Sequence, residues 1–155
     1  MALVMTGTKE ECCWELPDEL YYHTDDHIWA RIEGDRVLMG LDAFGLYAAG
    51  KLQYLKLLPV GRKVTKNRPF GTVESGKFIG PMRALVSGEM LEHNSLVVER
   101  PRTVNEDPYG HWIVAIRPTD LENDLVGLPH GEAEIRAWME REIDGYRSKD
   151  LLSCD

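Results

Sequence analysis

Hydrophobic and polar positions alternate over much of the chain in short runs, which is typical of β-strands with one buried face. Two such runs, Ile28–Glu33 and Arg36–Leu41, flank the dipeptide Gly34-Asp35. A two-residue glycine turn between strand-like runs predicts a β-hairpin. Similar patterns predict further strands over 52–58, 64–73 and 112–116.

Helical spacing is confined to three segments. Asp42 can cap a short helix that Gly50 ends. The capping-box pattern Thr119–Glu122 opens a second short helix, which stops at Gly127. The strongest helical pattern covers 132–146, where apolar residues recur every three or four positions. We expect this last helix to pack its apolar face on the sheet.

The stretch Phe70–Pro81 predicts a hairpin with a lysine at its tip. Gly76 and Gly80 are expected turn residues, and Pro81 is expected to end the strand pairing. Lys77 would then stand at the tip, shortly after Glu74. A lysine in this position reaches solvent and can be modified without disturbing a core. On these residues alone, an ordinary solvated lysine is the alternative interpretation.

Beyond this tip, residues 84–92 predict a second hairpin-like pair around Ser87-Gly88. Residues 93–109 are polar and rich in turn formers, so they predict a long ordered loop, and the length of that loop points to a function. The sequence predicts short strands and a few helical segments, without the regular alternation of strand and helix that βαβ units show. This pattern favours a mostly β fold with peripheral helices, either a β-sandwich or a flattened barrel.

The 155 residues suffice for one domain with a substantial core. Residues 1–20 lack periodicity and are expected to be an N-terminal extension anchored by Trp14 and Leu16. The ordered domain is expected over 21–147, followed by a C-terminal tail over 148–155.

The net charge and the cysteines restrict the classes of partner and the cellular compartment that we expect. The formal net charge of −8 argues against nucleic acid and anionic membranes, since both require a cationic face. No apolar run could span a bilayer and no signal peptide is apparent, so the expected location is the cytoplasm. Three cysteines near the ends do not form a disulfide framework, although pairing of Cys12 or Cys13 with Cys154, or a redox role, stays open.

Catalytic patterns are absent from the sequence. The five histidines are scattered without a metal-ligand spacing, and structural roles are expected for them. No nucleophile elbow and no glycine-rich phosphate loop occurs. The sequence therefore favours a non-catalytic carrier or binding module, with no metal.

Five blocks of residues in order resemble the H-protein family of the glycine cleavage system. The family's opening motif is similar to Tyr22, His27 and Trp29, with one residue added before the histidine, and its lipoylation motif Glu-Ser-x-Lys is matched at Glu74–Lys77. The other matching blocks are Gly40–Phe44, then Val86–Glu89 with Asn94, and finally Pro101, Asn105, Pro108, Tyr109 and Trp112.

This resemblance implies a lipoyl-domain-like β-sandwich (a barrel-sandwich hybrid) with a C-terminal helix. It also implies lipoic acid joined by an amide to Lys77, with Glu74, Ser75 and Gly76 forming the modification signal. The implied partners are a lipoate-protein ligase or other lipoate assembly enzymes, and a dihydrolipoamide dehydrogenase-like enzyme. Glycine decarboxylase and aminomethyltransferase would exchange the cargo in the glycine pathway.

Three positions depart from the family pattern and concern the neighbourhood of the cargo. Ile28 and Pro81 stand where the family has acids that would favour a cationic aminomethyl cargo, and Arg83 adds a positive charge. These departures resemble a divergent branch that serves heterodisulfide-reductase-like cytoplasmic sulfur oxidation, and this branch is the preferred prediction. The alternatives are an H protein of the glycine cleavage system and an unmodified scaffold protein. A biotin carrier is disfavoured because Gly76 and Phe78 flank the lysine.

Overall fold

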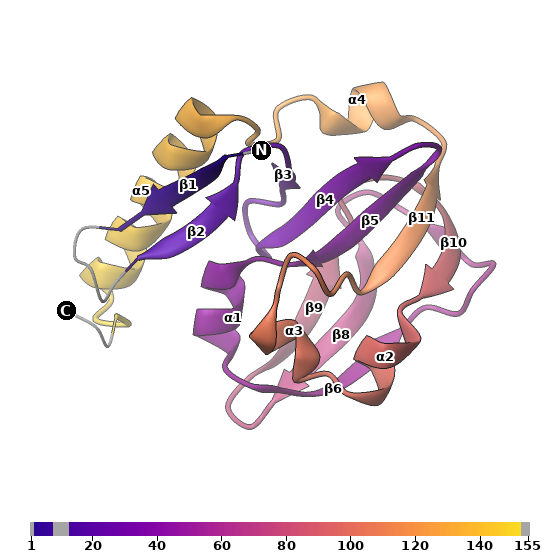
Figure 1. The fold of residues 1–155 in the computed structure, drawn as a ribbon, viewed down its shortest axis with the longest axis horizontal. Helices are drawn as coiled ribbons and strands as arrows, with labels where there is room; N and C mark the ends of the chain where they lie inside the picture. The colour runs from indigo at the N-terminus through magenta and orange to yellow at the C-terminus, as the bar shows by residue number, and fades with distance from the viewer. Residues whose placement is uncertain (1, 8–12, 153–155) are drawn as a thin grey trace.

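A computed structural model describes residues 2–7 and 13–152 of the chain. Figure 1 shows the arrangement of the elements in the described ranges. The strands are β1 (Leu3–Thr6), β2 (Trp14–Pro17), β3 (Tyr21–Tyr22), β4 (Ile28–Glu33), β5 (Arg36–Leu41), β6 (Leu52–Leu57), β7 (Lys63–Val64), β8 (Pro69–Ser75), β9 (Ile79–Arg83), β10 (Gly88–His93) and β11 (Val114–Pro118). The helices are α1 (Ala43–Ala49), α2 (Ser95–Glu99), α3 (Thr103–Glu106), α4 (Leu121–Leu125) and α5 (Glu132–Ser148).

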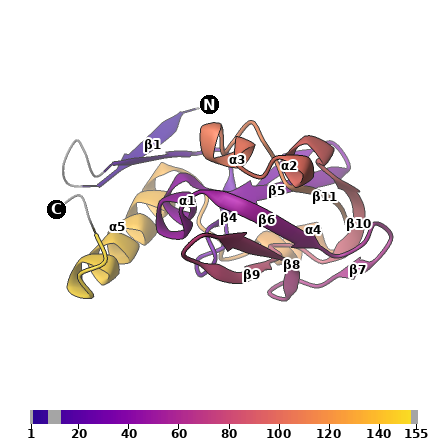
Figure 2. The ribbon, with the colours of Figure 1, turned by 90° about the horizontal axis from the view of Figure 1, so that it is seen from below.

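Two antiparallel sheets form the body of the molecule. One sheet has six strands in the order β3-β4-β5-β11-β10-β7, and the other has three in the order β6-β8-β9. Viewed edge-on, they form two layers (Figure 2). The main apolar core lies between them and draws buried residues from both, such as Ile28 and Met39 on one side and Phe70 and Met82 on the other. The predicted mostly β sandwich with peripheral helices and a C-terminal helix is therefore confirmed.

The predicted hairpin over 28–41 is confirmed as β4 and β5. Its last pair joins Glu33 to Arg36, and Gly34 adopts a left-handed φ of 64° in the turn. Gly40 on β5 lies directly under the Trp29 ring, since a Cβ there would come within 2.7 Å of the ring carbons. The hairpin thus fixes Trp29 over the backbone of its own partner strand.

The predicted hairpin over 84–92 is wrong. β9 pairs with β8, whereas β10 pairs with β11 and β7 in the other sheet. Ala84, Leu85 and Val86 are all fully buried between the sheets, where they carry the chain from one sheet to the other. Three consecutive buried side chains do not fit a strand with one solvent-facing side.

The region 93–109 contains two short helices, α2 and α3, which the prediction of a long ordered loop missed. Each helix is anchored by one fully buried valine, Val97 in α2 and Val104 in α3. Both helices are too short for helical periodicity to stand out in the sequence.

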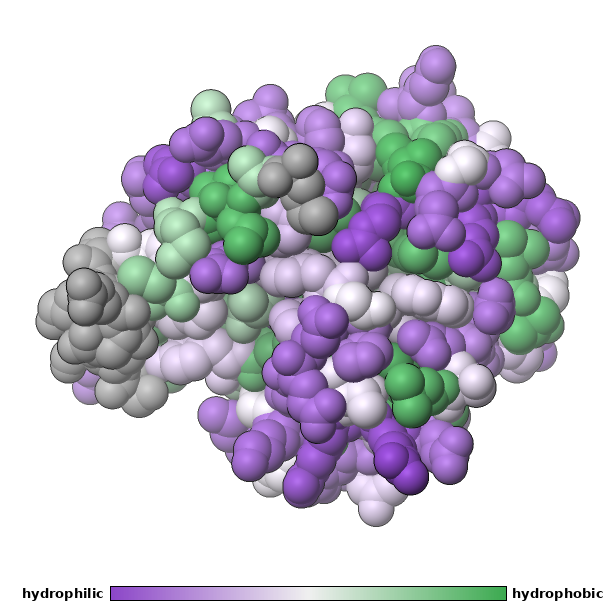
Figure 3. Space-filling view, in the orientation of Figure 1, coloured by the Kyte–Doolittle hydropathy of each residue, from purple (hydrophilic) through white to green (hydrophobic). Residues whose placement is uncertain are grey.

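The expected N-terminal extension contains a β-hairpin that the sequence pattern did not predict. β1 pairs with β2, and Trp14 and Leu16 are buried as anchors, as expected. This hairpin and α5 lie side by side at one end of the molecule (Figure 1). In the space-filling view, apolar side chains are visible over β1, where Leu3 and Met5 are exposed (Figure 3).

The predicted helices are confirmed as α1, α4 and α5. The predicted capping box of α4 does not form, because the helix is capped at Asp120 without a side-chain bond and the Thr119 hydroxyl donates to the carbonyl of Ser87. α5 buries Ile135, Trp138, Met139 and Ile143 in a second apolar cluster on the outer side of the larger sheet. Within the described ranges, no helix combines the length and the apolar character that crossing a bilayer requires.

Candidate functional site

Lys77 lies at the tip of the turn between β8 and β9. The last strand pair joins Glu74 to Ile79, and the side chain of Lys77 is exposed. The predicted tip position is therefore confirmed. The expectation that Gly80 is a turn residue and that Pro81 ends the strand pairing is wrong, because both lie within β9 and Pro81 pairs with Thr72. β9 is an edge strand, where proline's missing N–H group is tolerated.

Ser75 ties this turn to the end of α1. Its backbone N–H donates to the carbonyl of Phe78 at 2.8 Å, which closes the turn. Its hydroxyl donates to the carbonyl of Ala49 at 2.5 Å, and the residue is only 6% exposed. The serine of the Glu-Ser-x-Lys motif therefore has a structural task, namely to hold the tip in a fixed place.

The side chain of Lys77 lies across Gly50. A Cβ at Gly50 would come within 2.9 Å of Lys77 Cε and 3.7 Å of Cδ and Cγ. Gly50 also adopts φ 89° and ψ −160°, a backbone conformation that is essentially restricted to glycine. The backbone conformation thus requires glycine here, whereas the flexible Lys77 side chain can move away from an added Cβ.

Asn105 on α3 fixes the same stretch from the other side. Its side-chain amide donates to the carbonyl of Gly50 at 3.0 Å, and its side-chain oxygen accepts from the N–H of Leu52 at 2.9 Å. Gly50 lies at the junction between α1 and β6, and Leu52 is the first residue of β6, where the pairing with β8 is irregular. The asparagine of the fifth motif block therefore stabilises the platform beneath Lys77, which Gly50 and Asn105 form.

Gly50→Ala should destabilise the protein by about 1–3 kcal/mol, because alanine strains this backbone conformation. It should also displace the Lys77 side chain from the platform. Urea unfolding measures the first effect. As a control, Gly145→Ala adds a Cβ that meets nothing within 4 Å and should not destabilise α5. Equal stability of both variants would contradict the assignment.

The three positions that depart from the family pattern lie in different surroundings. Ile28 is fully buried in the main core, and Pro81 is exposed on β9. Arg83 is held by Asp26, whose carboxylate accepts from the guanidinium at 2.9 Å and from the backbone N–H of Arg83 at 2.8 Å. The positive charge expected from Arg83 is therefore largely neutralised within the protein.

Several aromatic residues of the matching motifs build the scaffold rather than the tip. Trp29 Nε1 donates to the carbonyls of Leu41 and Pro108, both at 3.1 Å. The hydroxyl of Tyr109 accepts from the N–H of Ala43 at 3.0 Å and donates to the carbonyl of Glu15 at 2.6 Å. These contacts join the first, second and last motif blocks, which are far apart in the sequence.

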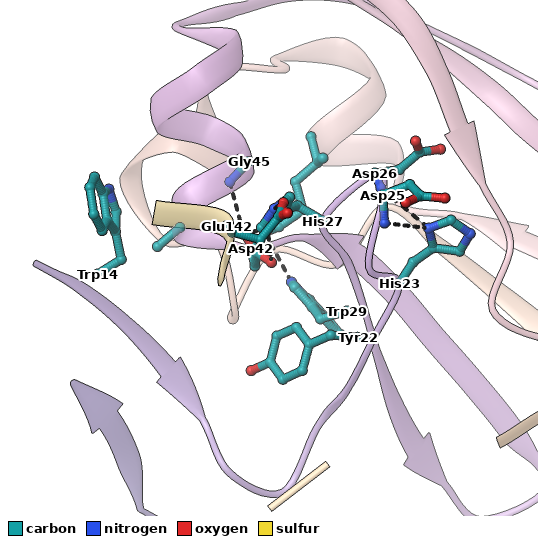
Figure 4. A network of polar contacts seen from close by, with 12 residues as sticks. Trp14, Tyr22, His23, Asp25, Asp26, His27, Trp29, Asp42, Gly45 and Glu142 are labelled. Atoms are coloured by element: carbon teal, nitrogen blue, oxygen red, sulfur yellow. Dashed lines mark hydrogen bonds and ion pairs between the residues drawn. The ribbon is translucent and has the colours of Figure 1, made fainter. Parts of the chain in front are cut away.

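A cluster of charged side chains joins the beginning of α1 to α5, and the sequence did not predict this cluster. His27 Nδ1 lies 2.9 Å from a carboxylate oxygen of Asp42, and its Nε2 lies 2.7 Å from Glu142 Oε1 on α5 (Figure 4). Asp42 is fully buried and also caps α1 by accepting from the N–H of Gly45 at 2.8 Å. The structural role expected for this histidine is confirmed, but Glu142 lies too far along the sequence for any spacing to reveal it.

Burial alone would lower the pKa of His27, but the two carboxylates outweigh it. Together they raise the pKa from 6.5 to about 9, with Asp42 contributing more than Glu142. The ring also stacks on Trp138 of α5, with centroids 4.8 Å apart. A protonated His27 therefore links β4, α1 and α5.

The stability of the protein should fall as the pH rises from about 6.5 to above 9. Because the folded pKa of His27 lies above its unfolded value, its contribution is complete below pH 6.5 and is lost as the pH passes through about 9. The expected loss is about 3 kcal/mol in the free energy of unfolding. Urea unfolding across this pH range measures it, and an unchanged free energy would refute the role of the cluster.

The metal-ligating side chains and the cysteines were also considered as candidates for a site. Within residues 2–7 and 13–152, no three His, Cys, Asp or Glu side chains are grouped to hold a metal ion. Cys13 is exposed, while Cys12 and Cys154 lie outside the described residues, so the alternatives of pairing and a redox role stay open.

Comparisons with known proteins agree with the motif blocks. A sequence model of the glycine cleavage H-protein family matches residues 20–141. Glycine cleavage system H protein 3 of Aquifex aeolicus is 45% identical over 136 residues, covering 84% of each chain. Probable glycine cleavage system H protein 3 of Sulfurisphaera tokodaii is 42% identical over 120 residues, covering 77% of this chain and 87% of the relative.

A solved structure supports the same relationship at the level of the fold. The crystal structure of a glycine cleavage system H protein from Mycobacterium marinum matches with a TM-score of 0.70 and 29% identity, covering 82% of this chain and 98% of the other. The chain therefore belongs to the glycine cleavage H-protein family, whose members are non-catalytic carriers that hold lipoic acid covalently on a lysine.

Proposed function

We propose that Lys77 carries the lipoyl group and that the resulting arm shuttles the aminomethyl group of the glycine cleavage system. The observation that carries the proposal is the position of Lys77, exposed at a turn whose flanks match the lipoylation motif and whose serine fixes it to α1. When bound, lipoic acid supplies a disulfide that can be reduced to a dithiol. Tethering keeps that group at high local concentration as partner enzymes dock in turn.

The residues around the tip have separate tasks in this proposal. Lys77 provides the amine, and the platform of Gly50 and Asn105 supports its side chain. Glu74 is half-buried at the start of the turn, between Tyr54 and Ile79 in the strand register, and contributes to recognition by a lipoate-protein ligase or another lipoate assembly enzyme. Ser75 and Gly76 set the shape of the turn.

The relatives' names favour the glycine pathway over sulfur oxidation. The proposed partners are therefore glycine decarboxylase, aminomethyltransferase and a dihydrolipoamide dehydrogenase-like enzyme. We also propose that the carrier domain covers residues 21–147.

Intact mass spectrometry after co-expression with a lipoate-protein ligase tests the attachment. We expect one added lipoyl group, mapped by peptide fragmentation to Lys77. An unmodified protein with every ligase and assembly enzyme tried would overturn the proposal and favour an unmodified scaffold.

Sulfur transport with a heterodisulfide-reductase-like complex is the second candidate, because Ile28 and Pro81 place no carboxylate where the family pattern has acids. The sequence suggests that the positive charge of Arg83 favours this candidate. This argument is weaker in the structure, because Arg83 already pairs with Asp26. Incubation of the reduced lipoyl protein with thiosulfate-derived donors tests it. A sulfur adduct on the arm, with none formed from glycine, would select this candidate.

A further inference from the structure

Two unpaired positive charges lie near the Lys77 turn, although the chain has a net charge of −8. Arg100 and Arg102 flank Pro101 in the segment that joins α2 to α3, and both side chains are exposed. Arg83 meets a carboxylate, whereas within the described ranges neither of these two side chains forms an ion pair or a hydrogen bond. Both guanidinium groups are therefore available to an external partner.

Arg100 and Arg102 border a groove of about 650 Å³. One wall is the beginning of β6, and the other is the segment that joins α2 to α3. Leu52 and Pro101 are buried at its base, while the side chain of Tyr54 is 66% exposed. Figure 3 shows mostly hydrophilic side chains on this lower part of the molecule, around α2, α3 and β6. The groove is lined by Leu52, Gln53, Tyr54, Arg100, Pro101, Arg102, Thr103 and Glu106.

The turn that carries the two arginines is held in place by hydrogen bonds. The N–H and the hydroxyl of Thr103 donate to the carbonyl of Arg100 at 3.0 and 2.8 Å. Asn105 donates its backbone N–H to the carbonyl of Arg102 at 3.0 Å, and its side-chain oxygen accepts from the N–H of Leu52 in the opposite wall. The two walls are thus fixed relative to each other before any partner binds, which lowers the entropic cost of binding.

The groove adjoins the Lys77 turn. Gln53 Nε2 lies 3.4 Å from the position that a Cβ on Gly76 would occupy, and Tyr54 pairs with Glu74 across the sheet. A specific protein interface usually covers about 800 Å² on each partner. An enzyme that joins lipoic acid to the Lys77 amine has no arm to bridge a distance, so its interface extends from the turn onto the neighbouring surface.

The residue types of the groove favour an acidic protein segment as its occupant. Tyrosine and arginine are enriched among the residues that dominate binding at protein interfaces, and the groove presents Tyr54 together with Arg100 and Arg102. Unpaired guanidinium groups bind carboxylates through paired, charge-assisted hydrogen bonds. Glu106 is the single acid in the lining, so positive charge prevails and an acidic segment is complementary to it.

We propose that this groove docks an acidic segment of the enzyme that attaches lipoic acid to Lys77. The inference rests on the proposed attachment to that lysine. Carboxylates of the segment pair with Arg100 and Arg102, and an apolar side chain of the segment packs on Tyr54 and Leu52. Charges at the rim of an interface act mainly on association, so the groove governs binding of the carrier rather than formation of the amide bond.

The kinetics of lipoyl attachment to the full-length, unmodified chain test the groove, with a lipoate-protein ligase as the probe. Intact mass gives the initial rate at increasing concentrations of the carrier. Arg100→Glu combined with Arg102→Glu should raise the KM for the carrier about tenfold and leave kcat within about twofold. Arg100→Lys combined with Arg102→Lys should raise KM less, because both charges remain. Between about 50 and 300 mM salt, the KM of the parent protein should rise, and that of the glutamate variant should change little.

Arg62→Glu combined with Arg68→Glu is the matched control. It makes the same change in net charge on two exposed arginines. Arg68 directly precedes β8 and Lys77 follows its other end, so the control site lies about 23 Å from the turn at about 3.3 Å per residue. We expect the control to keep the KM of the parent protein. All variants should keep the urea midpoint of the parent, because exposed charges contribute little to stability.

Each contrary outcome is distinct. Equal KM values for the glutamate variant and the parent, with the lipoyl mass on both, would overturn the groove and leave the proposed function standing. An equal rise in the control would show a general effect of charge and rule out docking at this place. A lower KM in the glutamate variant would contradict an acidic segment.

Sedimentation of the same proteins covers another occupant. Self-association of the parent that the glutamate variant abolishes, at an unchanged KM, would assign the groove to a second copy of the chain. Absence of the lipoyl mass from the parent protein overturns the proposed function itself, and the groove inference with it.

Discussion

We expect Lys77→Arg to abolish lipoylation and with it every transfer that depends on the proposed arm. Arginine keeps the positive charge and the length of the side chain, but its guanidinium is not the amine that forms the amide bond. Because Lys77 is exposed, the free energy of unfolding should change by less than about 0.5 kcal/mol. Intact mass after incubation with the ligase measures the modification, and urea unfolding measures the stability.

Lys56→Arg is the matched control for this experiment. Lys56 is also exposed and lies on β6 of the same sheet, but no modification motif surrounds it. We expect this variant to gain one lipoyl group, like the parent protein. A lipoyl group on the Lys77→Arg variant would assign the attachment to another lysine.

His27→Asn should lower the free energy of unfolding by about 3–5 kcal/mol, the usual loss when one partner of a buried ion pair is removed. Asp42 would keep its charge in a fully buried position and lose its cationic partner. Asparagine is chosen because it tolerates the left-handed backbone of this residue, which has φ 59°. The measurement is urea unfolding at pH 6, where the histidine is fully protonated.

A double-mutant cycle separates this ion pair from general damage. Asp42→Asn removes the buried charge, so the double variant should lose clearly less stability than the sum of the two single variants. His27→Asn should also remove the fall in stability between pH 6.5 and 9. Additive losses in the cycle would contradict the ion pair.

The hairpin over 28–41, the main helices and the lysine tip were predictable because each leaves a local pattern. The hairpin over 28–41 shows alternation around a glycine turn, and α5 shows a helical repeat. Lys77 could be singled out because its motif is contiguous in the sequence. These features depend on neighbours within a few residues.

Features that depend on distant partners could not be predicted. Ala84–Val86 looks like one arm of a hairpin, but the three residues cross between sheets. Arg83 was expected as an available cation, but Asp26 neutralises it from another loop. Glu142 meets His27 from the far end of the chain, and Asn105 reaches back to Gly50. No spacing in the sequence encodes those contacts.

The cargo of the arm provides the most direct test of the whole account. The lipoylated protein is incubated with glycine and glycine decarboxylase, and its mass is measured before and after. The account predicts an aminomethyl addition on the peptide that contains Lys77, and none on the Lys77→Arg variant. A lipoylated protein that gains no mass from glycine, but gains sulfur from a thiosulfate-derived donor, would contradict the proposed pathway.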